Sequence, residues 1–265
     1  MPANCSIELL IRAAGQGRRI VRHYAENKRP TKPRKKDDGS LLTKADLASQ
    51  KAICGFLSRN LQGIPIISEE AADLQSDISK GQWLIIDPLD GTTNFTRSIP
   101  FYSITIAYVV DGTPQAGVVM PAAWDHCYAA VKDSFAAMVD DDFNRIPIRC
   151  KNRPLEESVL CVTCDHSNPA GREKWWQWMD KLRPPTCFRL RIIESSALEL
   201  CLLAEGKIDG YLHPTDKPWD MGAAGLIVQE AGGKVFDIDG GPWSLNSNGI
   251  IAVSPAITGL LSMIS

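Results

Sequence analysis

The chain has 265 residues, of which 44% are hydrophobic, enough to bury the core of one large domain or of two packed lobes. Its 29 lysines and arginines nearly balance 31 aspartates and glutamates, so the overall charge indicates neither a nucleic-acid-binding protein nor an acidic solvating one. No stretch approaches the ~18 apolar residues of a membrane span or the apolar segment of a signal peptide. These features, with eight scattered cysteines typical of reduced thiols, predict a cytoplasmic protein without a membrane partner.

The first 150 residues show two helical patterns followed by short apolar runs. Apolar residues recur at helical spacing from Ile7 to Tyr24 and again from about Ala45 to Leu61. Between them, the prolines and charges of NKRPTKPRKKDDGS predict a mobile loop without a packed element. The apolar runs that follow, with a hairpin signal at Asp111-Gly112, predict a largely antiparallel sheet behind the two helices.

Beyond roughly residues 145–157 the pattern changes to strands and helices in alternation. Apolar segments such as SVLCVTC and GIIAVS indicate strands, and SALELCLLAEG and DMGAAGLIVQEAGG indicate helices that end at Gly206 and Gly232. We therefore expect a mixed α/β protein of two tightly packed lobes, an N-terminal α+β lobe over residues 1–150 and a C-terminal α/β lobe over residues 151–265.

The stretch WLIIDPLDGTTNF places carboxylates directly after a buried strand. Asp87 falls where the strand is expected to leave the core, and Pro88 should prevent the strand from continuing. Asp90 follows, Gly91 lets the backbone approach a ligand closely, and residues 92–94 offer hydroxyl and amide groups suited to an anion. A divalent cation that bridges to a phosphate satisfies both the carboxylates and the anion donors.

Two further segments supply carboxylates. The apolar run of IPIISEE ends in Glu69 and Glu70, and Asp220 follows a tryptophan in KPWDMGAAG, at the start of a helix of small residues. Oxygen donors without a histidine or cysteine cluster favour Mg²⁺ or Mn²⁺ over Zn²⁺. The alternative for any single acid of this kind is a solvated strand end or a helix cap.

These motifs resemble the inositol monophosphatase family. WLIIDPLDGTTNF, the upstream ISEE and the downstream PWDMGAAG have that family's order and spacing over almost the whole chain, and the D-P-x-D-G-T-x-N segment is highly specific. The resemblance implies a layered αβαβα sugar-phosphatase sandwich, Mg²⁺-dependent and lithium-sensitive phosphatase activity, and a homodimer.

Matched residue by residue, the family pattern implies a complete site. The expected metal ligands are Glu69, Asp87, the carbonyl of Leu89, Asp90 and Asp220. The backbone N–H groups of Gly91 and Thr92 match the positions that hold the phosphate, and Thr92 and Asp46 match the pair that orients the attacking water. Glu70 is not a direct ligand in that pattern.

The leading hypothesis is therefore a phosphomonoesterase that uses two or three Mg²⁺ ions, with Mn²⁺ as an alternative, and metal-activated water without a covalent intermediate. The expected partner is a small hydroxylated phosphate such as inositol monophosphate. Fructose 1,6-bisphosphate, histidinol phosphate and 3′-phosphoadenosine phosphate are the alternatives. The rival from another class is a non-catalytic binding protein that uses either a basic run or a tryptophan-rich helix. The basic run comprises Lys28, Arg29, Lys32, Arg34, Lys35 and Lys36. The tryptophan-rich helix carries Trp175, Trp176 and Trp178. Nucleic acid is not an expected partner.

Substrate choice is expected to depend on residues far along the chain. The family usually has glycine where Glu194 stands, and His213 occupies the position at which inositol-selective members carry an acidic residue, with Asp216 close by. Glu194, Ser195, Ser196 and His213 are therefore candidate specificity residues, beside Asp90 and Asp220, which also border the substrate in the family pattern. A surface or helix-capping role is the alternative for each of the four.

Overall fold

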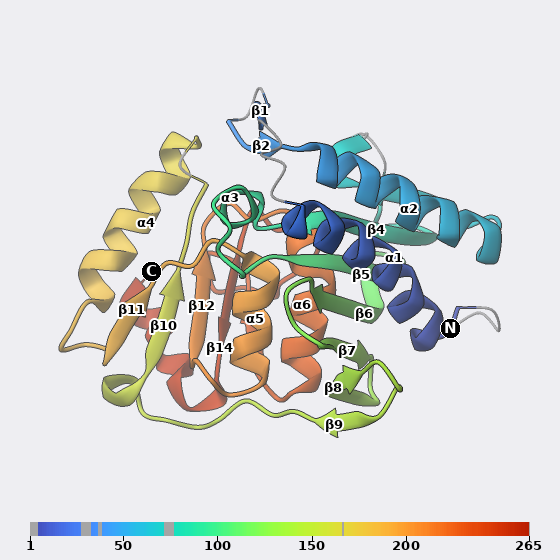
Figure 1. The fold of residues 1–265 in the computed structure, drawn as a ribbon. Coiled ribbons are helices and arrows are strands. Elements are labelled where there is room, and N and C mark those ends of the chain that lie inside the picture. Colours follow the sequence, from blue (N-terminus) through green and yellow to red (C-terminus); the bar gives the residue numbers. More distant parts are fainter. Residues whose placement is uncertain (1–4, 28–32, 37–38, 72–76, 166, 265) are drawn as a thin grey trace.

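Two large β-sheets and three layers of helices alternate through the molecule, as Figure 1 shows for the computed structural model of the chain. The structure describes residues 5–27, 33–36, 39–71, 77–165 and 167–264. The helices are α1 (Ile7–Glu26), α2 (Lys44–Asn60), α3 (Thr92–Thr96), α4 (Pro169–Leu182), α5 (Ser196–Ala204), α6 (Pro218–Glu230) and α7 (Leu261–Ile264). The strands are β1 (Arg34–Lys35), β2 (Leu41–Leu42), β3 (Ile66–Ser68), β4 (Gln82–Asp90), β5 (Ser103–Val110), β6 (Thr113–Pro121), β7 (His126–Val131), β8 (Phe135–Asp140), β9 (Arg145–Pro147), β10 (Val159–Val162), β11 (Arg189–Arg191), β12 (Gly210–His213), β13 (Lys234–Phe236) and β14 (Ile250–Val253).

The first large sheet contains β3 to β9 in sequence order, and every neighbouring pair except β3 and β4 is antiparallel. This confirms the prediction of a largely antiparallel sheet. Asp111 and Gly112 join β5 to β6 with φ angles of 46° and 72°, the paired left-handed conformation of a tight hairpin. Helices α1 and α2 cover one face of this sheet (Figure 1).

The segment between the first two helices differs in part from its prediction. Arg34–Lys35 and Leu41–Leu42 pair as two short antiparallel strands, where a loop without any element was expected. Both residues of β1 are exposed, so the pairing adds backbone hydrogen bonds without the apolar burial that the local sequence excludes. Lys28, Arg29 and Lys32 of the basic run lie outside the described residues.

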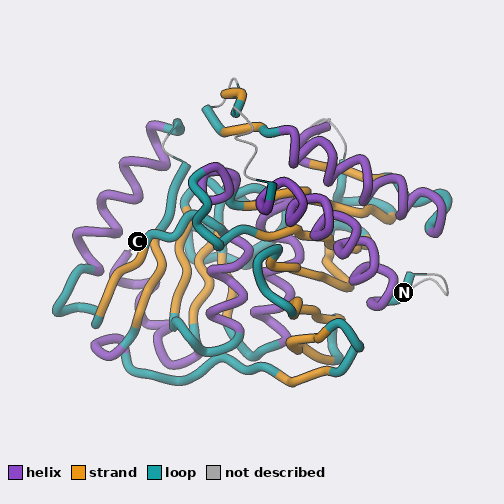
Figure 2. The backbone as a smooth tube through the Cα atoms, viewed as in Figure 1, coloured by secondary structure: helices purple, strands orange, loops and turns teal. Residues whose placement is uncertain are grey.

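The second sheet has the order β11-β10-β12-β14-β13 in the described part of the chain. Its first three strands are parallel, and β14 is antiparallel to both of its neighbours. Helices α5 and α6 pack between the two sheets, and α4 covers the outer face of the second sheet (Figure 2). The succession of helices, sheet, helices, sheet and helix is the layered αβαβα sandwich that the family resemblance implied.

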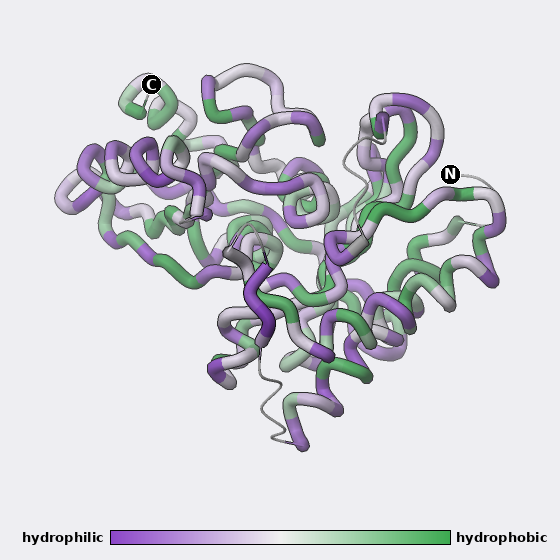
Figure 3. Tube along the Cα trace, turned by 90° about the horizontal axis from the view of Figure 1, so that it is seen from above, coloured by the Kyte–Doolittle hydropathy of each residue, from purple (hydrophilic) through white to green (hydrophobic). Residues whose placement is uncertain are grey.

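Apolar side chains fill the spaces between the layers in three clusters. One lies between α1, α2 and the first sheet, one surrounds α5 and α6, and one lies beneath α4. In β4, Leu84 and Ile86 belong to the first of these clusters and Ile85 to the second, as the alternating geometry of a strand requires. Along the tube of Figure 3, hydrophobic and hydrophilic stretches alternate, as expected for elements that bury one face.

The cluster around α5 and α6 contains residues of both sheets, so the two halves of the chain share one core. A division into lobes near residue 150 stays a prediction. Among the described helices, none combines the length and the apolar character that a bilayer crossing requires.

Candidate active site

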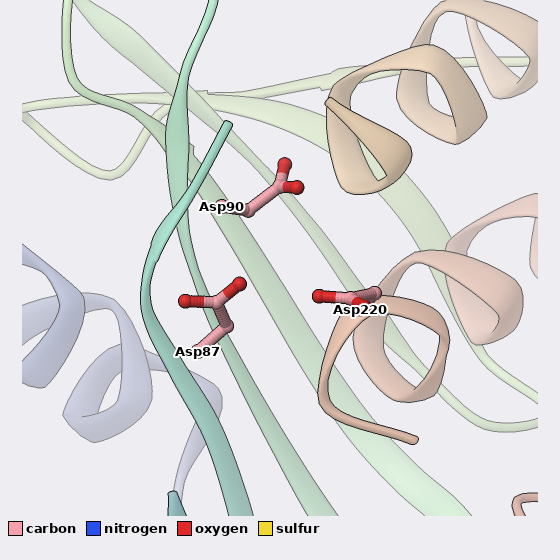
Figure 4. Close-up of side chains that lie close together, drawn as sticks. All are labelled: Asp87, Asp90 and Asp220. Atoms are coloured by element: carbon pink, nitrogen blue, oxygen red, sulfur yellow. The ribbon is translucent and has the colours of Figure 1, made fainter. Parts of the chain in front are cut away.

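Asp87, Asp90 and Asp220, here called the aspartate triad, point toward one another from two elements (Figure 4). Asp87 and Asp90 lie at the end of β4, and Asp220 lies in the first turn of α6. One carboxylate oxygen of each lies within 4.8 Å of the others. Three carboxylates from distant parts of the sequence thus share one small volume.

A bulge in β4 brings its two aspartates to the same side. The strand pairs Asp87 with Thr105 and Asp90 with Ser103, and its register shifts between the two pairs. The prediction that Pro88 ends the strand was therefore wrong. Proline is tolerated at the bulge because the ladder is interrupted there, and the Leu89 N–H instead donates to Asp87 Oδ1 over 2.8 Å.

Thr105 links the strand to the helix that carries the third aspartate. Its Oγ1 accepts from the Asp87 N–H at 3.2 Å and donates to the carbonyl oxygen of Trp219 at 2.7 Å. Small residues allow α6 to lie close to the sheet. Gly117 of β6 faces Ala223 of α6, and a Cβ on Gly117 would be only 2.8 Å from Ala223 Cα. Both contacts fix the distance between Asp220 and the end of β4.

Burial and mutual repulsion disfavour ionisation of the triad. Burial, reinforced by the charge of Glu69, raises the pKa of Asp87 well above its ordinary value. Burial also raises the pKa of Asp90 to about 7, although Ser103 and Ser195 donate hydrogen bonds to Oδ2 of that carboxylate. For Asp220 the same desolvation acts together with the charge of Asp216, and its pKa is likewise raised.

The triad fits a divalent cation. Within the described ranges, no lysine or arginine pairs with any of its three carboxylates, so their charge has no protein counterion. Their donor atoms are all oxygens, which suits Mg²⁺ or Mn²⁺ better than Zn²⁺. The Leu89 carbonyl lines the same pocket and could add a neutral oxygen ligand.

Gly91 and Thr92 form the start of the short helix α3, beside Asp90. Gly91 has φ 84°, and a Cβ there would lie 3.0 Å from the carbonyl oxygen of Phe101, so glycine is the residue that suits this position. In the described part of the chain, the N–H groups of Gly91 and Thr92 donate no backbone hydrogen bond outside regular structure. They remain available to an anion.

Asp46 contacts Thr92, as the family pattern implied. Thr92 Oγ1 lies 3.1 Å from Asp46 Oδ1 and 3.0 Å from the Leu89 carbonyl oxygen, so its single proton is shared between two acceptors. The other Asp46 oxygen accepts from the Thr43 N–H at 2.8 Å in a capping box at the start of α2. Burial raises the pKa of Asp46 above its ordinary value.

Glu69 lines the pocket but its carboxylate is already paired. Lys36 Nζ lies 2.8 Å from Glu69 Oε1 and 2.8 Å from Glu70 Oε1. Desolvation lowers the pKa of Lys36, but attraction to the two glutamates outweighs it and holds the pKa above its ordinary value. The sequence placed Lys36 in the basic run of a predicted mobile loop, and that prediction missed this contact.

The candidate specificity residues lie on the opposite wall of the pocket. Glu194 has φ 64°, a left-handed conformation in keeping with the glycine that the family usually has there. His213 is buried in β12, where its Nδ1 accepts from the Thr215 N–H at 3.2 Å. Ser196 Oγ accepts from the Tyr211 hydroxyl at 2.7 Å and donates to Asp216 at 3.3 Å.

One pocket of about 500 Å³ collects nearly all of the predicted site residues. Its walls include Glu69, Asp87, Leu89, Asp90, Gly91, Thr92, Glu194, Ser196, His213 and Asp220. Asp46 and Ser195 stand behind the wall and contact Thr92 and Asp90. A hollow of about 590 Å³ between Leu61–Pro65 and Lys80–Trp83 has no carboxylate, histidine or cysteine among its described lining residues, so it offers no comparable chemistry.

Two contributing residues, Thr105 and Glu199, were not predicted from the sequence, and Asn94 was predicted in another role. Thr105 acts through hydrogen bonds that no local pattern indicates, and the Asn94 amide, expected to face an anion, donates to the carbonyl oxygen of Ile193 instead. Glu199 is a fully buried carboxyl in α5, and burial raises its pKa to about 8. A lone charge inside the apolar run SALELCLL was a signal that could have identified it.

The tryptophan-rich helix is only partly a free surface. All three tryptophans belong to α4. Trp175 and Trp178 are buried on the face of this helix that packs against the core, whereas Trp176 is 61% exposed. Two of the three therefore pack on the core, and one remains accessible to a partner.

Comparison with known proteins identifies similar chains across the full length. The model of the inositol monophosphatase family matches residues 4–263. A protein of Pasteurella multocida named Nus factor SuhB is 33% identical over 255 residues, which cover 96% of this chain and 93% of the relative. An inositol-1-monophosphatase of Mesorhizobium japonicum is 30% identical over 260 residues, covering 97% and 94%.

Solved structures show the same fold. The extragenic suppressor protein suhB from Bartonella henselae superposes with a TM-score of 0.84 at 26% identity, over 97% of this chain and 96% of that one. An IMPase from Thermotoga maritima gives a TM-score of 0.83 at 27% identity, over 97% and 95%.

Proposed function

The chain belongs to the inositol monophosphatase family, and on that premise we propose that it is an Mg²⁺-dependent phosphomonoesterase of a small hydroxylated phosphate. Inositol monophosphate is the first candidate substrate. The aspartate triad carries the proposal, because three converging carboxylates that have no counterion among the described residues call for a divalent cation. A relative named inositol-1-monophosphatase supports the same reaction class.

Asp87, Asp90, Asp220 and the Leu89 carbonyl would hold the cations, with Glu69 as a further ligand once it exchanges Lys36 for a metal. Bound there, two or three Mg²⁺ ions, or Mn²⁺ ions in their place, would offset the negative charge of the transferring phosphoryl group and lower the pKa of water. The N–H groups of Gly91 and Thr92 would donate hydrogen bonds to the phosphate oxygens beside them.

Thr92 and Asp46 orient a water molecule for attack on phosphorus. When Thr92 Oγ1 donates its proton to Asp46 Oδ1, the lone pairs of the hydroxyl oxygen are free to accept from a water in the pocket. Asp46 is held in place by Thr43, so the hydroxyl has a fixed direction. No serine or cysteine nucleophile is needed, and the proposal includes no covalent intermediate.

The decisive experiment measures phosphate release from myo-inositol 1-phosphate, fructose 1,6-bisphosphate, histidinol phosphate and phosphoadenosine phosphate, with Mg²⁺ and with EDTA. We expect Mg²⁺-dependent release that Asp90→Asn and Asp220→Asn abolish. Asp209→Asn is the matched control, because Asp209 is buried and paired with Arg153 at 2.7 Å but does not line the pocket. Near wild-type rates in both triad variants would refute the assignment.

A second candidate is a non-catalytic binding or regulatory role, favoured by the relatives named Nus factor SuhB, a name that does not designate a phosphatase. Trp176, exposed on α4, is the residue that such a role would use first. Absence of metal-stimulated release across the whole substrate panel would favour this candidate over the enzyme.

Three further properties belong to the proposal by family resemblance. A homodimer would appear in sedimentation as twice the 29.1 kDa chain mass. Inhibition by Li⁺ would appear in the phosphate-release assay, and a cytoplasmic location would appear in cell fractionation.

A further inference from the structure

The turn Ile193–Ser195, called here the selectivity turn, joins β11 to α5 and carries Glu194 at the pocket wall. Glu194 adopts a φ of 64°, which side chains other than glycine and asparagine rarely occupy. Within the described part of the chain, its carboxylate forms no ion pair within 4.0 Å of a lysine or arginine. A carboxylate side chain that has no ion pair with any described residue therefore lines the pocket, on a backbone that favours glycine.

Glu199 holds this turn from the core side. Its Oε1 accepts from the Ile193 N–H and its Oε2 from the Ser195 N–H, each at 3.3 Å, so the two amides that flank Glu194 bind one carboxyl group. Glu199 is fully buried, and Thr163 donates to it as well, at 3.3 Å. All of these partners donate to the carboxyl group. An amide in its place would turn one of the two acceptor oxygens into an NH₂ donor, so it could not accept from both backbone N–H groups in this arrangement.

Asn94, which lies in α3, holds the turn from the side on which the Gly91 and Thr92 N–H groups would bind the phosphate. Its Nδ2 donates to the carbonyl oxygens of Ile193 at 2.7 Å and Glu194 at 3.3 Å, and to that of Phe101 at 3.0 Å. Ser195 Oγ donates to Asp90. The backbone of the selectivity turn is thus fixed relative to both the aspartate triad and α3.

The charge of the surrounding wall indicates what Glu194 selects. Apart from Asp220, the wall built by residues 163–220 carries three carboxylates, Asp165, Glu194 and Asp216, against one lysine, Lys217, among its described residues. Cations at the triad compensate a single phosphate there, but they do not compensate this wall. A second phosphate on the substrate would meet like charge in a confined space.

We propose that Glu194 is a specificity residue that excludes substrates with a second anionic group, and that Glu199 is the residue that positions it. The inference rests on the proposed phosphatase function and restricts its substrates to monophosphates whose remainder is neutral or cationic. It disfavours fructose 1,6-bisphosphate and phosphoadenosine phosphate relative to inositol or histidinol phosphate.

The test compares kcat/KM for myo-inositol 1-phosphate with that for fructose 1,6-bisphosphate. We expect the wild type to prefer the monophosphate and Glu194→Gly to shift the ratio about tenfold toward the bisphosphate, since glycine keeps the turn and removes the charge. Glu199→Gln should shift the ratio in the same direction through KM, and should add nothing in the Glu194→Gly background.

Two measurements separate positioning from general damage. Hydrogen exchange of the Ile193 and Ser195 amides should accelerate in Glu199→Gln. It should stay unchanged in Glu205→Gln, a matched loss of a glutamate that accepts from Tyr128 at 2.8 Å just beyond the end of α5. An unchanged substrate ratio in Glu194→Gly, or equal additional shifts from Glu199→Gln in both backgrounds, would overturn the inference. No release by the wild type from any of the four substrates of the panel would instead overturn the proposed function on which it rests.

Discussion

Replacement of Thr105 by valine tests whether the aspartate triad depends on a single buried hydroxyl. Valine has nearly the same shape, so the change removes the oxygen that joins the Asp87 N–H to the Trp219 carbonyl with little loss of volume. Asp87 stays paired with β5 and the Trp219 carbonyl lies in α6, so each of the two lost hydrogen bonds costs about 0.5–1.5 kcal/mol. We expect Thr105→Val to lower the free energy of unfolding by about 1–3 kcal/mol.

The same change should weaken the cation site, because it loosens Asp87 of β4 from the helix that carries Asp220. Second-layer contacts of metal ligands commonly contribute tenfold or more to affinity, so we expect the Mg²⁺ dissociation constant to rise about tenfold. Urea denaturation in EDTA measures the stability term, and isothermal titration with Mg²⁺ measures the affinity. Thr105→Ser is the matched control, since it keeps the oxygen and loses one methyl group, at a cost of about 1 kcal/mol.

The reasoning fails if Thr105→Val unfolds within about 0.5 kcal/mol of the wild type and binds Mg²⁺ equally well. That result would mean that packing alone holds the strand and the helix together. A serine variant as weak in Mg²⁺ binding as the valine variant would contradict the role of the hydroxyl in the same way.

Three other perturbations address the site. In EDTA, the pKa values of the triad are raised, to about 7 for Asp90, so the folded protein retains protons that the unfolded chain releases. The stabilisation that these protons provide is complete below about pH 4 and is lost as the pH rises through about 7. We therefore expect Tm to fall over that window in EDTA and saturating Mg²⁺ to reverse the fall. A Tm that rises over the same window in EDTA would contradict this sign. Gly91→Ala should destabilise the fold by about 1–2 kcal/mol in urea denaturation, because φ is 84° there, and should raise KM for phosphate esters. Lys36→Met should tighten Mg²⁺ binding because it frees Glu69, and should weaken inhibition by inorganic phosphate because it removes a positive charge from the pocket wall. Mg²⁺ dissociation constants and phosphate inhibition constants equal to those of the wild type would show that the ion pair does not compete with the metal.

Local patterns predicted the elements and the main acids of the site well. The helices at Ile7–Glu26 and Lys44–Asn60 and the antiparallel sheet followed from periodicity and turn signals, whereas the family resemblance implied that Asp220 joins Asp87 and Asp90. The expected end of β4 at Pro88 was wrong, because a bulge lets a strand pass a proline, and a bulge leaves no clear mark in a single sequence.

Contacts between side chains that are distant in sequence could not be predicted. Lys36 meets Glu69 and Glu70 across more than thirty residues, and Asn94 meets the Ile193–Ser195 turn across about one hundred. Each partner has an ordinary local role available, in a solvated basic run or in a helix start. Only the packing of the layers decides which role is realised.

Asp46 belongs to two structures at once, the capping box of α2 and the contact with Thr92. Transient fraying of the first turn of α2 would therefore release the threonine hydroxyl from its fixed direction, even with every metal ligand in place. A conformational fluctuation at a helix end and the geometry of the attacking water are coupled through one carboxylate. An engineered replacement of this cap, even one that strengthens the helix, would have to retain the aspartate at that position.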